Sequence, residues 1–279
     1  MRILLTGRNG QVGWELERAL APLGEVVATD RSTLDLENEK QIRSVVRAVR
    51  PEVVVNSAAY TAVDKAESEP ELAMRINGLA PGVLAEEAKR LGALLVHYST
   101  DYVFDGEKAA PYVEEDAPNP INVYGRSKLE GEHAVQQSGC RHLILRTSWV
   151  YGARGKNFLL TMLRLARERR ELRVVDDQVG APTSSSAIAR ATVQSLGRSV
   201  QGLYHFSAAG AVSWCGFARA ILARAGIDTP VVAIRSEDYP TPARRPRNSC
   251  LDCSRLRADG GLRIASWEEL LSEVNFASL

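Results

Sequence analysis

The sequence predicts an α/β protein built on a doubly wound parallel sheet, with a smaller lobe toward the C-terminus. Three observations lead to this prediction. Short runs rich in Val, Ile and Leu alternate with longer amphipathic segments over residues 1–150. A glycine-rich segment directly follows the first apolar run. After residue 150 the alternation weakens, and proline and arginine become frequent. Alternating strand and helix patterns over this length favour a parallel sheet with helices on both faces.

The apolar runs predict five strands, because continuous runs of this length suit strands that are buried on both faces. These strands are expected at 2–6, 26–29, 53–56, 94–99 and 142–147. Amphipathic segments between them predict helices at about 11–21, 38–50, 70–91 and 122–138. The order predicts that the carboxyl ends of the strands form one edge, where open α/β sheets bind ligands.

The second half predicts a smaller lobe over that edge. A basic amphipathic segment at 157–170 predicts a helix, "LRVV" at 172–175 a short strand, and "DDQVGAPTSS" at 176–185 a loop. We expect a dinucleotide-binding domain at 1–150 with part of about 178–210, and a substrate-binding lobe at about 151–177 and 210–279.

The composition is that of an ordinary globular protein, with 45% hydrophobic and 25% charged residues among 279. A net charge of +1 gives no reason to expect nucleic acid or a membrane as a partner. The absence of a secretory signal and of a long apolar run indicates a cytoplasmic protein. The cysteines support this location, since they form no disulfide framework: Cys140, Cys215, Cys250 and Cys253. Cys250 and Cys253 make one CxxC, but a zinc site needs two further ligands, so we expect no metal there.

Glycines open the first predicted helix in the segment "LLTGRNGQVGWEL". Gly7, Gly10 and Gly13 supply a tight turn and a close backbone approach, and the helix N-terminus offers free N–H groups to a pyrophosphate. Asp30 ends the second strand, at the distance expected for a carboxylate that binds the adenosine ribose. The combination predicts a Rossmann-type site for NADH or NADPH.

The residues leave the choice of dinucleotide open. Asp30 would repel a 2′-phosphate, whereas Arg31 or Arg8 could bind one, so use of both cofactors is expected. The small residues Ser57, Ala58 and Ala59 would let the backbone approach a flat ring or a ribose; equally, they could simply form a tight βα turn.

Tyr124 and Lys128, in "NVYGRSKLEGE", lie four residues apart in a predicted helix and therefore on one face of it. Such pairs are frequent on exposed helices. On a dinucleotide-binding fold, however, a phenol could donate the proton that ketone reduction needs, and a neighbouring ammonium would lower the pKa of that phenol. Thr100, at the end of the fourth strand, could hydrogen-bond and orient the carbonyl.

These features together resemble the extended short-chain dehydrogenase/reductase family, with TGxxGxxG at Thr6–Gly13, "HYSTDYVFDG" at 97–106, and YxxxK at Tyr124 and Lys128. Further blocks resemble the dTDP-4-dehydrorhamnose reductases within that family. They are "GQVGWELERALAPLG", "AAYTAVDKAESEPELA", "LRTSWVYG", "DDQVGAPTS" and "YPTPARRPRNSCLD", and the resemblance extends from residue 1 to about 253.

The resemblance implies NAD(P)H-dependent reduction of the 4-keto group of dTDP-4-dehydro-L-rhamnose. It implies a catalytic triad of Tyr124, Lys128 and Thr100. The implied cofactor contacts, besides the glycines, Tyr124 and Lys128, are Gln11, Val12, Asp30, Asp35, Leu36, Ala59, Tyr60 and Thr61. The implied sugar contacts are Thr100, Asp101, Tyr124 and Trp149, although a tryptophan is more often part of a core.

Two further sets of residues are candidates for contacts with the nucleotide part of the substrate. Asn157, Gln178 and Thr183 are weaker candidates for the nucleotide side of the cleft. Arg244, Arg245 and Arg247 could bind a diphosphate or form a solvated basic loop.

The resemblance also implies a homodimer in which Mg²⁺, bound by glutamates, links the two copies of the chain. Glu15 is present, but Ser186 stands where an acidic ligand after "GAPT" would fall. A site poor in carboxylates binds Mg²⁺ weakly, so we expect no metal and leave the oligomeric state open.

Two other functions are compatible with the same fold. A nucleotide-sugar epimerase or dehydratase would recycle the hydride, but a dehydratase needs an acid/base pair where this chain has Thr100-Asp101-Tyr102. A non-catalytic NADP-sensing regulatory subunit would have no need of a proton donor such as Tyr124.

Overall fold

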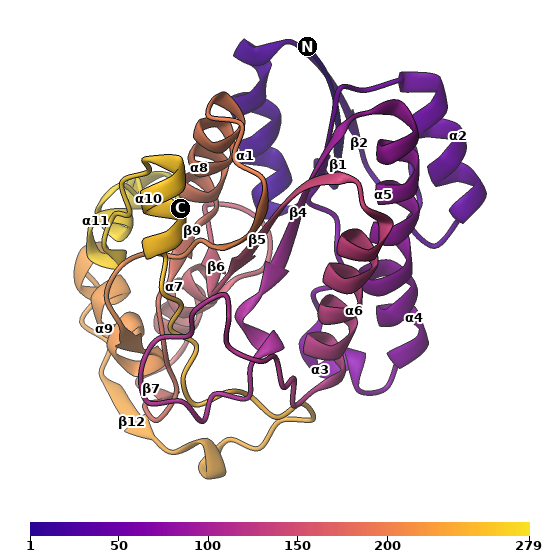
Figure 1. Ribbon diagram of the computed structural model, residues 1–279. Helices are drawn as coiled ribbons and strands as arrows, with labels where there is room; N and C mark the ends of the chain where they lie inside the picture. The colour runs from indigo at the N-terminus through magenta and orange to yellow at the C-terminus, as the bar shows by residue number, and fades with distance from the viewer.

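The computed structural model describes residues 1–279, and its centre is a six-stranded sheet in the order β10-β5-β4-β3-β1-β2 (Figure 1). All neighbouring strands in it are parallel, which confirms the predicted fold class. The strands are β1 (Arg2–Thr6), β2 (Glu25–Thr29), β3 (Val53–Asn56), β4 (Leu94–Thr100), β5 (Arg141–Thr147) and β10 (Gly202–His205).

The five strands predicted from the sequence lie within one residue of the observed bounds at each end. The sixth strand, β10, was not predicted. It is only four residues long, "GLYH", and half of it is partly exposed, so it has no continuous apolar run. Pairing with Leu143–Arg146 of β5 makes it a strand. The local sequence alone gives little sign of it.

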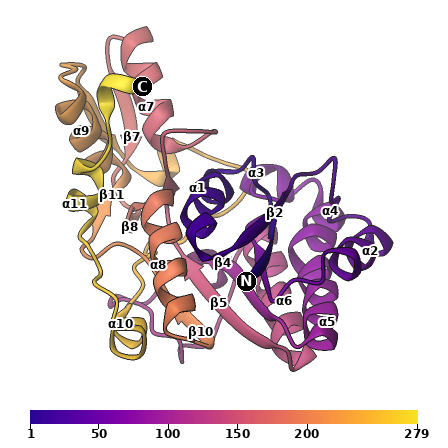
Figure 2. The same ribbon diagram turned by 90° about the horizontal axis from the view of Figure 1, so that it is seen from above.

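Helices cover both faces of the sheet, as Figures 1 and 2 show. One face carries α1 (Gln11–Leu20) and α8 (Ser185–Gly197), and the other carries α2 (Glu39–Val49), α5 (Ala80–Leu91) and α6 (Val123–Ser138). Successive strand residues point to opposite faces. Ile3 and Leu5 therefore join the core under α1 and α8, whereas Leu4 joins the core under α2 and α5.

The helix predicted at 70–91 is interrupted by a wide turn. It consists of α4 (Pro70–Met74), a π-helical turn (Arg75–Leu79) and α5, and a short helix, α3 (Val63–Ala66), precedes it. Helical turns of this kind are frequent at functional sites. The turn brings Asn77, which is 1% exposed, inward toward the loop that follows β3.

A second group of elements has its own core. It contains α7 (Phe158–Glu168), β7 (Leu172–Val175), α9 (Trp214–Ala225), β12 (Val231–Ile234) and α11 (Trp267–Ser272). Their buried cluster includes Leu159, Leu172 and Phe217 and is separate from the two clusters on the sheet. β7 pairs in parallel with β12 (Figure 1). The predicted helix at 157–170 and the strand at 172–175 are thus present, with the helix slightly shorter.

Short strand pairs join the second group to the sheet. β6 (Val150–Tyr151) pairs with β9 (Thr183–Ser184), and β8 (Val179–Gly180) pairs with β11 (Val212–Ser213). After β12 the chain continues through a long, mostly irregular segment into α10 (Ser254–Gly260). The loop at 148–157 contacts the glycine loop, since Asn157 donates to Gln11, and the loop at 239–250 contacts the start of α6, since Asn122 donates to the Arg244 carbonyl.

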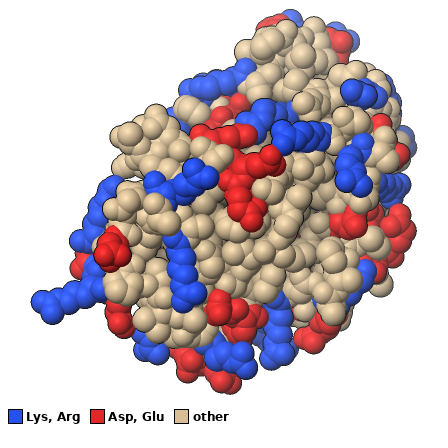
Figure 3. Space-filling model, turned by 90° about the vertical axis from the view of Figure 1, so that its left-hand side faces the viewer, with Lys and Arg blue, Asp and Glu red and all other residues tan.

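The surface carries both signs of charge. Figure 3 shows basic and acidic side chains interspersed over the face that includes the C-terminal elements. No helix has the length and apolarity needed to span a bilayer.

The buried ion pair between Glu132 of α6 and Arg146 of β5 gives a test of the packing. Arg146 Nη2 lies 2.6 Å from Glu132 Oε2, and the two side chains are 4% and 1% exposed. We expect Glu132→Gln to lower the free energy of unfolding by about 3–5 kcal/mol, because it leaves a buried guanidinium without its counter-charge. Urea denaturation measures this change.

Glu168→Gln is the matched control, because Glu168 pairs with Arg164 while both side chains are at least half exposed. We expect that change to cost about 0.5 kcal/mol or less. Equal losses of unfolding free energy in the two variants would contradict the role assigned to the buried pair.

Candidate functional site

A cavity of about 660 Å³ lies at the carboxyl ends of the central strands. It sits where the strand order reverses between β1 and β3, the usual ligand position in such sheets. Most residues predicted to contact the cofactor line it: Gly7, Gly10, Gln11, Val12, Asp30, Asp35, Leu36, Ala59, Tyr60, Thr61, Tyr124 and Lys128.

The glycine loop permits two close backbone contacts. Gly7 has φ +75°, and a Cβ there would lie 2.8 Å from backbone atoms of Ala58. A Cβ on Gly13 would lie 2.1 Å from the carbonyl oxygen of Gly7. Gly13 does not line the cavity; it lets α1 approach the turn. Gly10 begins α1 without a side-chain cap, so N–H groups of the first turn remain available for an anion.

Asp30 is held by hydrogen bonds at one end of the cavity. Its Oδ1 accepts from the Ser32 hydroxyl at 2.6 Å and the Ser32 N–H at 3.0 Å, and its Oδ2 accepts from Asn9 at 3.2 Å. The Ser32 hydrogen bonds lower the pKa of Asp30. Asp30 is therefore a carboxylate anion at neutral pH.

The segment after β3 is fixed by a residue that sequence reasoning missed. Asn77 accepts from the Tyr60 N–H at 2.8 Å, donates to the Tyr60 carbonyl at 2.9 Å, and also donates to Ser127 of α6 at 3.0 Å. It thereby joins the wall made by Ala59, Tyr60 and Thr61 to the helix that carries Tyr124. The local sequence carries no clear signal of this role, since Asn77 is one of several polar residues in an amphipathic segment.

Tyr124 and Thr100 meet at the other end of the cavity. Thr100 ends β4, Tyr124 lies in the first turn of α6, and the Thr100 hydroxyl lies near enough to the phenol to act against the rise in its pKa. Asn122 positions that turn because its side chain caps the Gly125 N–H at 2.7 Å. Burial raises the pKa of Tyr124 to about 12, and the Asp101 carboxylate adds to this rise.

Lys128 lies one turn further along α6 and is 2% exposed. Its Nζ donates to the Tyr98 carbonyl at 2.5 Å, and burial lowers its pKa to about 8. The predicted lowering of the Tyr124 pKa by Lys128 is therefore wrong for this state of the protein. Desolvation dominates both groups, and it favours the neutral form of each.

Unpartnered polar atoms surround this end of the cavity. The hydroxyls of Ser99 and Thr147 and the Oδ2 atom of Asp101 are buried without a hydrogen-bond partner. Ser99 and Thr147 line the cavity, whereas Thr100 and Asp101 are buried and are not among its lining residues. Burial raises the pKa of Asp101 to about 6, against hydrogen bonds from Ser249 and Thr100. Buried polar groups normally have partners, so these atoms fit a polar ligand.

Comparison with known proteins gives the family. A family model described as the RmlD substrate binding domain matches residues 1–277. A dTDP-4-dehydrorhamnose reductase from Burkholderia thailandensis is 50% identical, over 96% of this chain and 95% of its own length. The chain belongs to the dTDP-4-dehydrorhamnose reductase family.

Solved structures agree with this assignment. A dTDP-4-dehydrorhamnose reductase from Bacillus anthracis, in complex with NADP, is 40% identical with a TM-score of 0.94, covering 97% of each chain. An orthologue from Clostridium acetobutylicum is 40% identical with a TM-score of 0.96, covering 100% of each chain. A UDP-glucose 4-epimerase from Thermus thermophilus, at 23% identity, shares the fold with a TM-score of 0.84.

Trp149 has a conformation that its position after β5 does not explain. Its φ of +48° is in the left-handed region, which a bulky residue rarely adopts. Its ring stacks on Trp214 at 3.4 Å between centroids, and it also packs against Gly180. Trp149 is partly exposed and outside the lining of the 660 Å³ cavity. Trp149 is therefore not a fully buried core residue, and its contact with the sugar stays a prediction.

In the loop that carries Arg244, Arg245 and Arg247, Arg245 differs from both interpretations, whereas Arg244 and Arg247 are exposed. Arg245 forms two hydrogen bonds with Asp64, at 3.0 and 2.7 Å, and its side chain is 22% exposed. The Arg244 carbonyl accepts from Asn122, the cap of α6, at 2.8 Å. Arg245 is therefore neither a solvated side chain nor a free cation. It attaches the loop to α3, the short helix that carries Asp64.

The three weaker candidates make structural hydrogen bonds. Asn157 caps α7 and donates to Gln11 in the glycine loop at 2.9 Å. Gln178 donates to Ser236 at 2.9 Å, and Thr183 donates to the Ala181 carbonyl at 2.9 Å. None of them lines the cavity.

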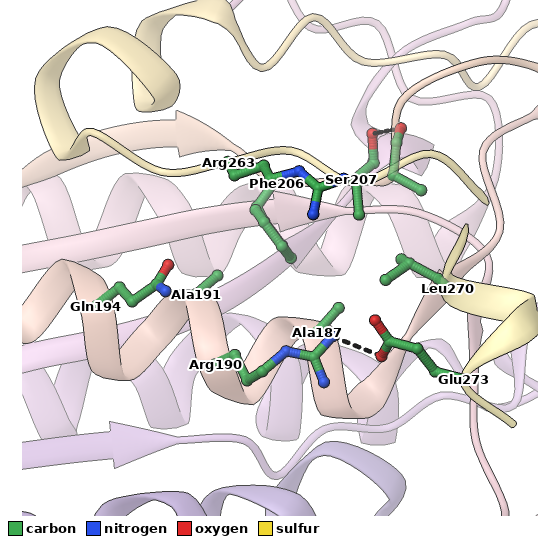
Figure 4. Close-up of a pocket in the computed structure, with 11 residues that line it drawn as sticks. Ala187, Arg190, Ala191, Gln194, Phe206, Ser207, Arg263, Leu270 and Glu273 are labelled. Atoms are coloured by element: carbon green, nitrogen blue, oxygen red, sulfur yellow. Dashed lines mark hydrogen bonds and ion pairs between the residues drawn. The ribbon is translucent and has the colours of Figure 1, made fainter. Parts of the chain in front are cut away.

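The region expected for a family metal does not suit Mg²⁺. Arg190 of α8 donates to Glu273 at 2.8 Å beside a cavity of about 220 Å³ (Figure 4). The Arg190 charge also acts on Glu15 and favours its ionised form, although burial raises the Glu15 pKa overall. A guanidinium therefore already stands among the carboxylates, and Ser186 adds no charge. No group of three or more potential ligands converges on a metal position.

The cysteines are all free and buried. Burial raises the pKa of the Cys250 thiol, and it raises that of Cys253 to about 11. Thiols of this kind are poor nucleophiles and poor metal ligands.

Gly13 provides a test of the close contact in the glycine loop. We expect Gly13→Ala to weaken binding of a reduced nicotinamide dinucleotide by about tenfold or more, because the added Cβ displaces the Gly7 carbonyl. Titration of the nicotinamide fluorescence measures this affinity.

The matched control is Gly197→Ala at the end of α8, where a Cβ has no neighbour within 4 Å. Unchanged affinity in Gly13→Ala would show that the loop tolerates a wider turn.

Proposed function

We infer that the chain catalyses the NAD(P)H-dependent reduction of the 4-keto group of dTDP-4-dehydro-L-rhamnose to dTDP-L-rhamnose. Membership of the family over nearly the whole chain supports this reaction. One observation carries the chemistry: a protonated phenol, Tyr124, lies on the wall of a cavity that begins at the glycine loop, with Thr100 close to it.

The proposed cofactor position follows from the cavity wall. The first turn of α1 and the glycine loop would hold the pyrophosphate, and Asp30 would accept from ribose hydroxyls. Ala59, Tyr60 and Thr61 would border the cofactor between its two ends. When bound, the reduced nicotinamide supplies a hydride to the ketone carbon.

Tyr124 is the proposed proton donor. A pKa of about 12 keeps its hydroxyl protonated at neutral pH, so the proton is present when charge develops on the ketone oxygen. The Thr100 hydroxyl, which donates to Asp101 Oδ1 at 3.1 Å, would exchange that bond for one to the ketone oxygen and orient it toward Tyr124. Asp101, whose Oδ2 has no partner, would accept from a sugar hydroxyl.

Lys128 has two proposed tasks. Its side chain lines the cavity, where it would donate to ribose hydroxyls of the cofactor. Its charge would also stabilise the tyrosinate that remains after proton transfer. The hydrogen bond to the Tyr98 carbonyl keeps the ammonium in place for both tasks.

We propose that the second group of elements, at about 151–177 and 210–279, binds the sugar nucleotide. The unusual backbone of Trp149, held against Trp214, would present a flat apolar surface to the sugar. Arg245 would act through the loop it attaches, and Arg244 and Arg247 are the remaining candidates for the diphosphate. A homodimer and a cytoplasmic location stay predictions from the sequence.

One assay distinguishes a reductase from an epimerase and from a regulatory subunit. Purified protein is mixed with NADPH or NADH and dTDP-4-dehydro-L-rhamnose, and absorbance of the reduced nicotinamide is followed. The reductase consumes one equivalent of reduced nicotinamide for each sugar reduced. Sugar conversion without net loss of absorbance would indicate an epimerase, and binding without conversion would indicate a regulatory subunit.

Tyr124→Phe tests the proton donor. We expect kcat to fall by about 10²- to 10⁴-fold, since the proton must then come from water. Dinucleotide affinity should stay close to that of the unmodified chain, because the phenyl ring preserves the packing. Tyr98→Phe is the control, because the Tyr98 hydroxyl is bonded to Thr192 and not to the reacting groups. Full turnover in Tyr124→Phe would exclude Tyr124 as the donor.

A further inference from the structure

Tyr102 lies in the tight turn at the end of β4, next to Thr100 and Tyr124. It is the middle residue of the 3-10 turn Asp101–Val103, which directly follows Thr100. The Tyr102 N–H donates to the Thr100 hydroxyl oxygen at 3.2 Å, and the same hydroxyl donates to Asp101 Oδ1 at 3.1 Å. The backbone of Tyr102 therefore helps to fix the position of the Thr100 side chain.

The Tyr102 peptide also supports the first turn of α6. A Cβ on Gly125 would lie 2.1 Å from the Tyr102 carbonyl oxygen, so the helix rests directly on this peptide. The Asn122 side chain caps the Gly125 N–H at 2.7 Å and holds the start of the helix. The contact with Gly125 involves only the backbone of Tyr102, so it remains when the Tyr102 side chain is replaced.

The ring of Tyr102 meets the ring of Tyr124. The two centroids lie 5.7 Å apart and the ring planes are 83° from parallel, which is the edge-to-face geometry that aromatic pairs prefer. Tyr124 lines the cavity of about 660 Å³, whereas Tyr102 is not among its lining residues. Tyr102 therefore supports the Tyr124 ring from outside the cavity.

The Tyr102 hydroxyl has surroundings of its own. Burial raises the pKa of Tyr102, the Asp101 carboxylate adds to this rise, and the Arg245 guanidinium opposes it. Arg245 is itself fixed by two hydrogen bonds to Asp64. Replacing Tyr102 by phenylalanine removes the hydroxyl from these charges and leaves the ring against Tyr124, so the two parts of the side chain can be tested separately.

We propose that the ring of Tyr102 positions Tyr124 for proton transfer to the ketone. A side chain in the first turn of a helix rotates between staggered conformations. The Tyr102 ring occupies one side of the Tyr124 ring and restricts that rotation. A general acid must lie within hydrogen-bond reach of the atom that it protonates, and a displacement of about 1 Å can cost about 100-fold in rate. The inference rests on the proposed reductase and gives it a positioning residue that acts through Tyr124.

The experiment compares variants that remove the ring with one that removes only the hydroxyl. Tyr102→Leu and Tyr102→Met keep an apolar side chain without a ring, and we expect kcat for reduction of the sugar to fall about 10- to 100-fold. We expect kcat of Tyr102→Phe to stay within about threefold of the unmodified chain, because the edge-to-face contact is retained. Dinucleotide affinity, measured by nicotinamide fluorescence, should change by less than about twofold in all three variants, because Tyr102 does not line the cavity.

The solvent isotope effect on kcat separates positioning from a loss of folded protein. A badly placed phenol makes proton transfer more limiting, so the ratio of kcat in H₂O to kcat in D₂O should rise in Tyr102→Leu and Tyr102→Met. In Tyr102→Phe it should return to the value of the unmodified chain. A smaller folded fraction would lower kcat equally in both solvents and leave the ratio unchanged. Thermal unfolding of each variant measures that fraction.

Tyr204→Leu is the matched control. Tyr204 is 5% exposed, belongs to the core under α1 and α8 on the face of the sheet opposite α6, and donates to Asp259 at 2.9 Å. Losing this ring removes a comparable amount of buried aromatic surface away from Tyr124. We expect the isotope effect and the kcat of the folded fraction to stay unchanged.

Full kcat in Tyr102→Leu and Tyr102→Met would overturn the inference. An equal loss of kcat in Tyr102→Phe would also overturn it, because the hydroxyl and not the ring would then be required. A fall in kcat with an unchanged isotope effect would show a general structural role instead. Failure of the unmodified chain to reduce the sugar would contradict the proposed function itself, and the inference would fall with it.

Discussion

The close packing of α6 against the end of β4 is the contact on which the candidate site depends. The buried ammonium of Lys128 donates to the Tyr98 carbonyl at 2.5 Å. The helix can come this near because two of its residues have no side chain. A Cβ on Gly125 would lie 2.1 Å from the Tyr102 carbonyl oxygen, and one on Gly131 would lie 2.1 Å from that of Asn77. Tyr124 meets Thr100 only because the helix is held at this distance.

The same contact organises the wall of the cavity. Asn77 lies in the wide helical turn that Gly131 touches, and it joins Ser127 of α6 to the backbone of Tyr60. At its N-terminus α6 is joined to the arginine loop, since Asn122 binds the Arg244 carbonyl. Arg245 then reaches Asp64, close to the segment after β3. Segments from three parts of the chain therefore take their positions from one helix, which explains how a second group of elements comes to lie beside the reacting groups.

The local sequence predicted those features that local chemistry decides. Strands buried on both faces, the glycine turn, Asp30 at the end of β2 and the Tyr124–Lys128 spacing are all visible within a few residues. Contacts between distant segments were not predictable in this way. Arg245 and Asp64 are 181 residues apart, and Asn77 became important only through the wide turn in its helix. The predicted direction of the shift in the Tyr124 pKa was wrong for a related reason. A neighbouring charge can be read from spacing, but the burial that outweighs it depends on the whole fold.

The electrostatics of the two ends of the cavity differ in kind. At the adenosine end, carboxylates and guanidiniums are charged and paired with one another at or near the surface. At the Tyr124 end, burial brings the pKa of Lys128 down to about 8 and that of Asp101 up to about 6, while Tyr124 is held near 12. Groups poised around neutral pH respond strongly to a ligand that desolvates them further or supplies a counter-charge. One end of the cleft thus carries charges that are fixed at neutral pH. The other is suited to changing its own charge as a proton leaves Tyr124.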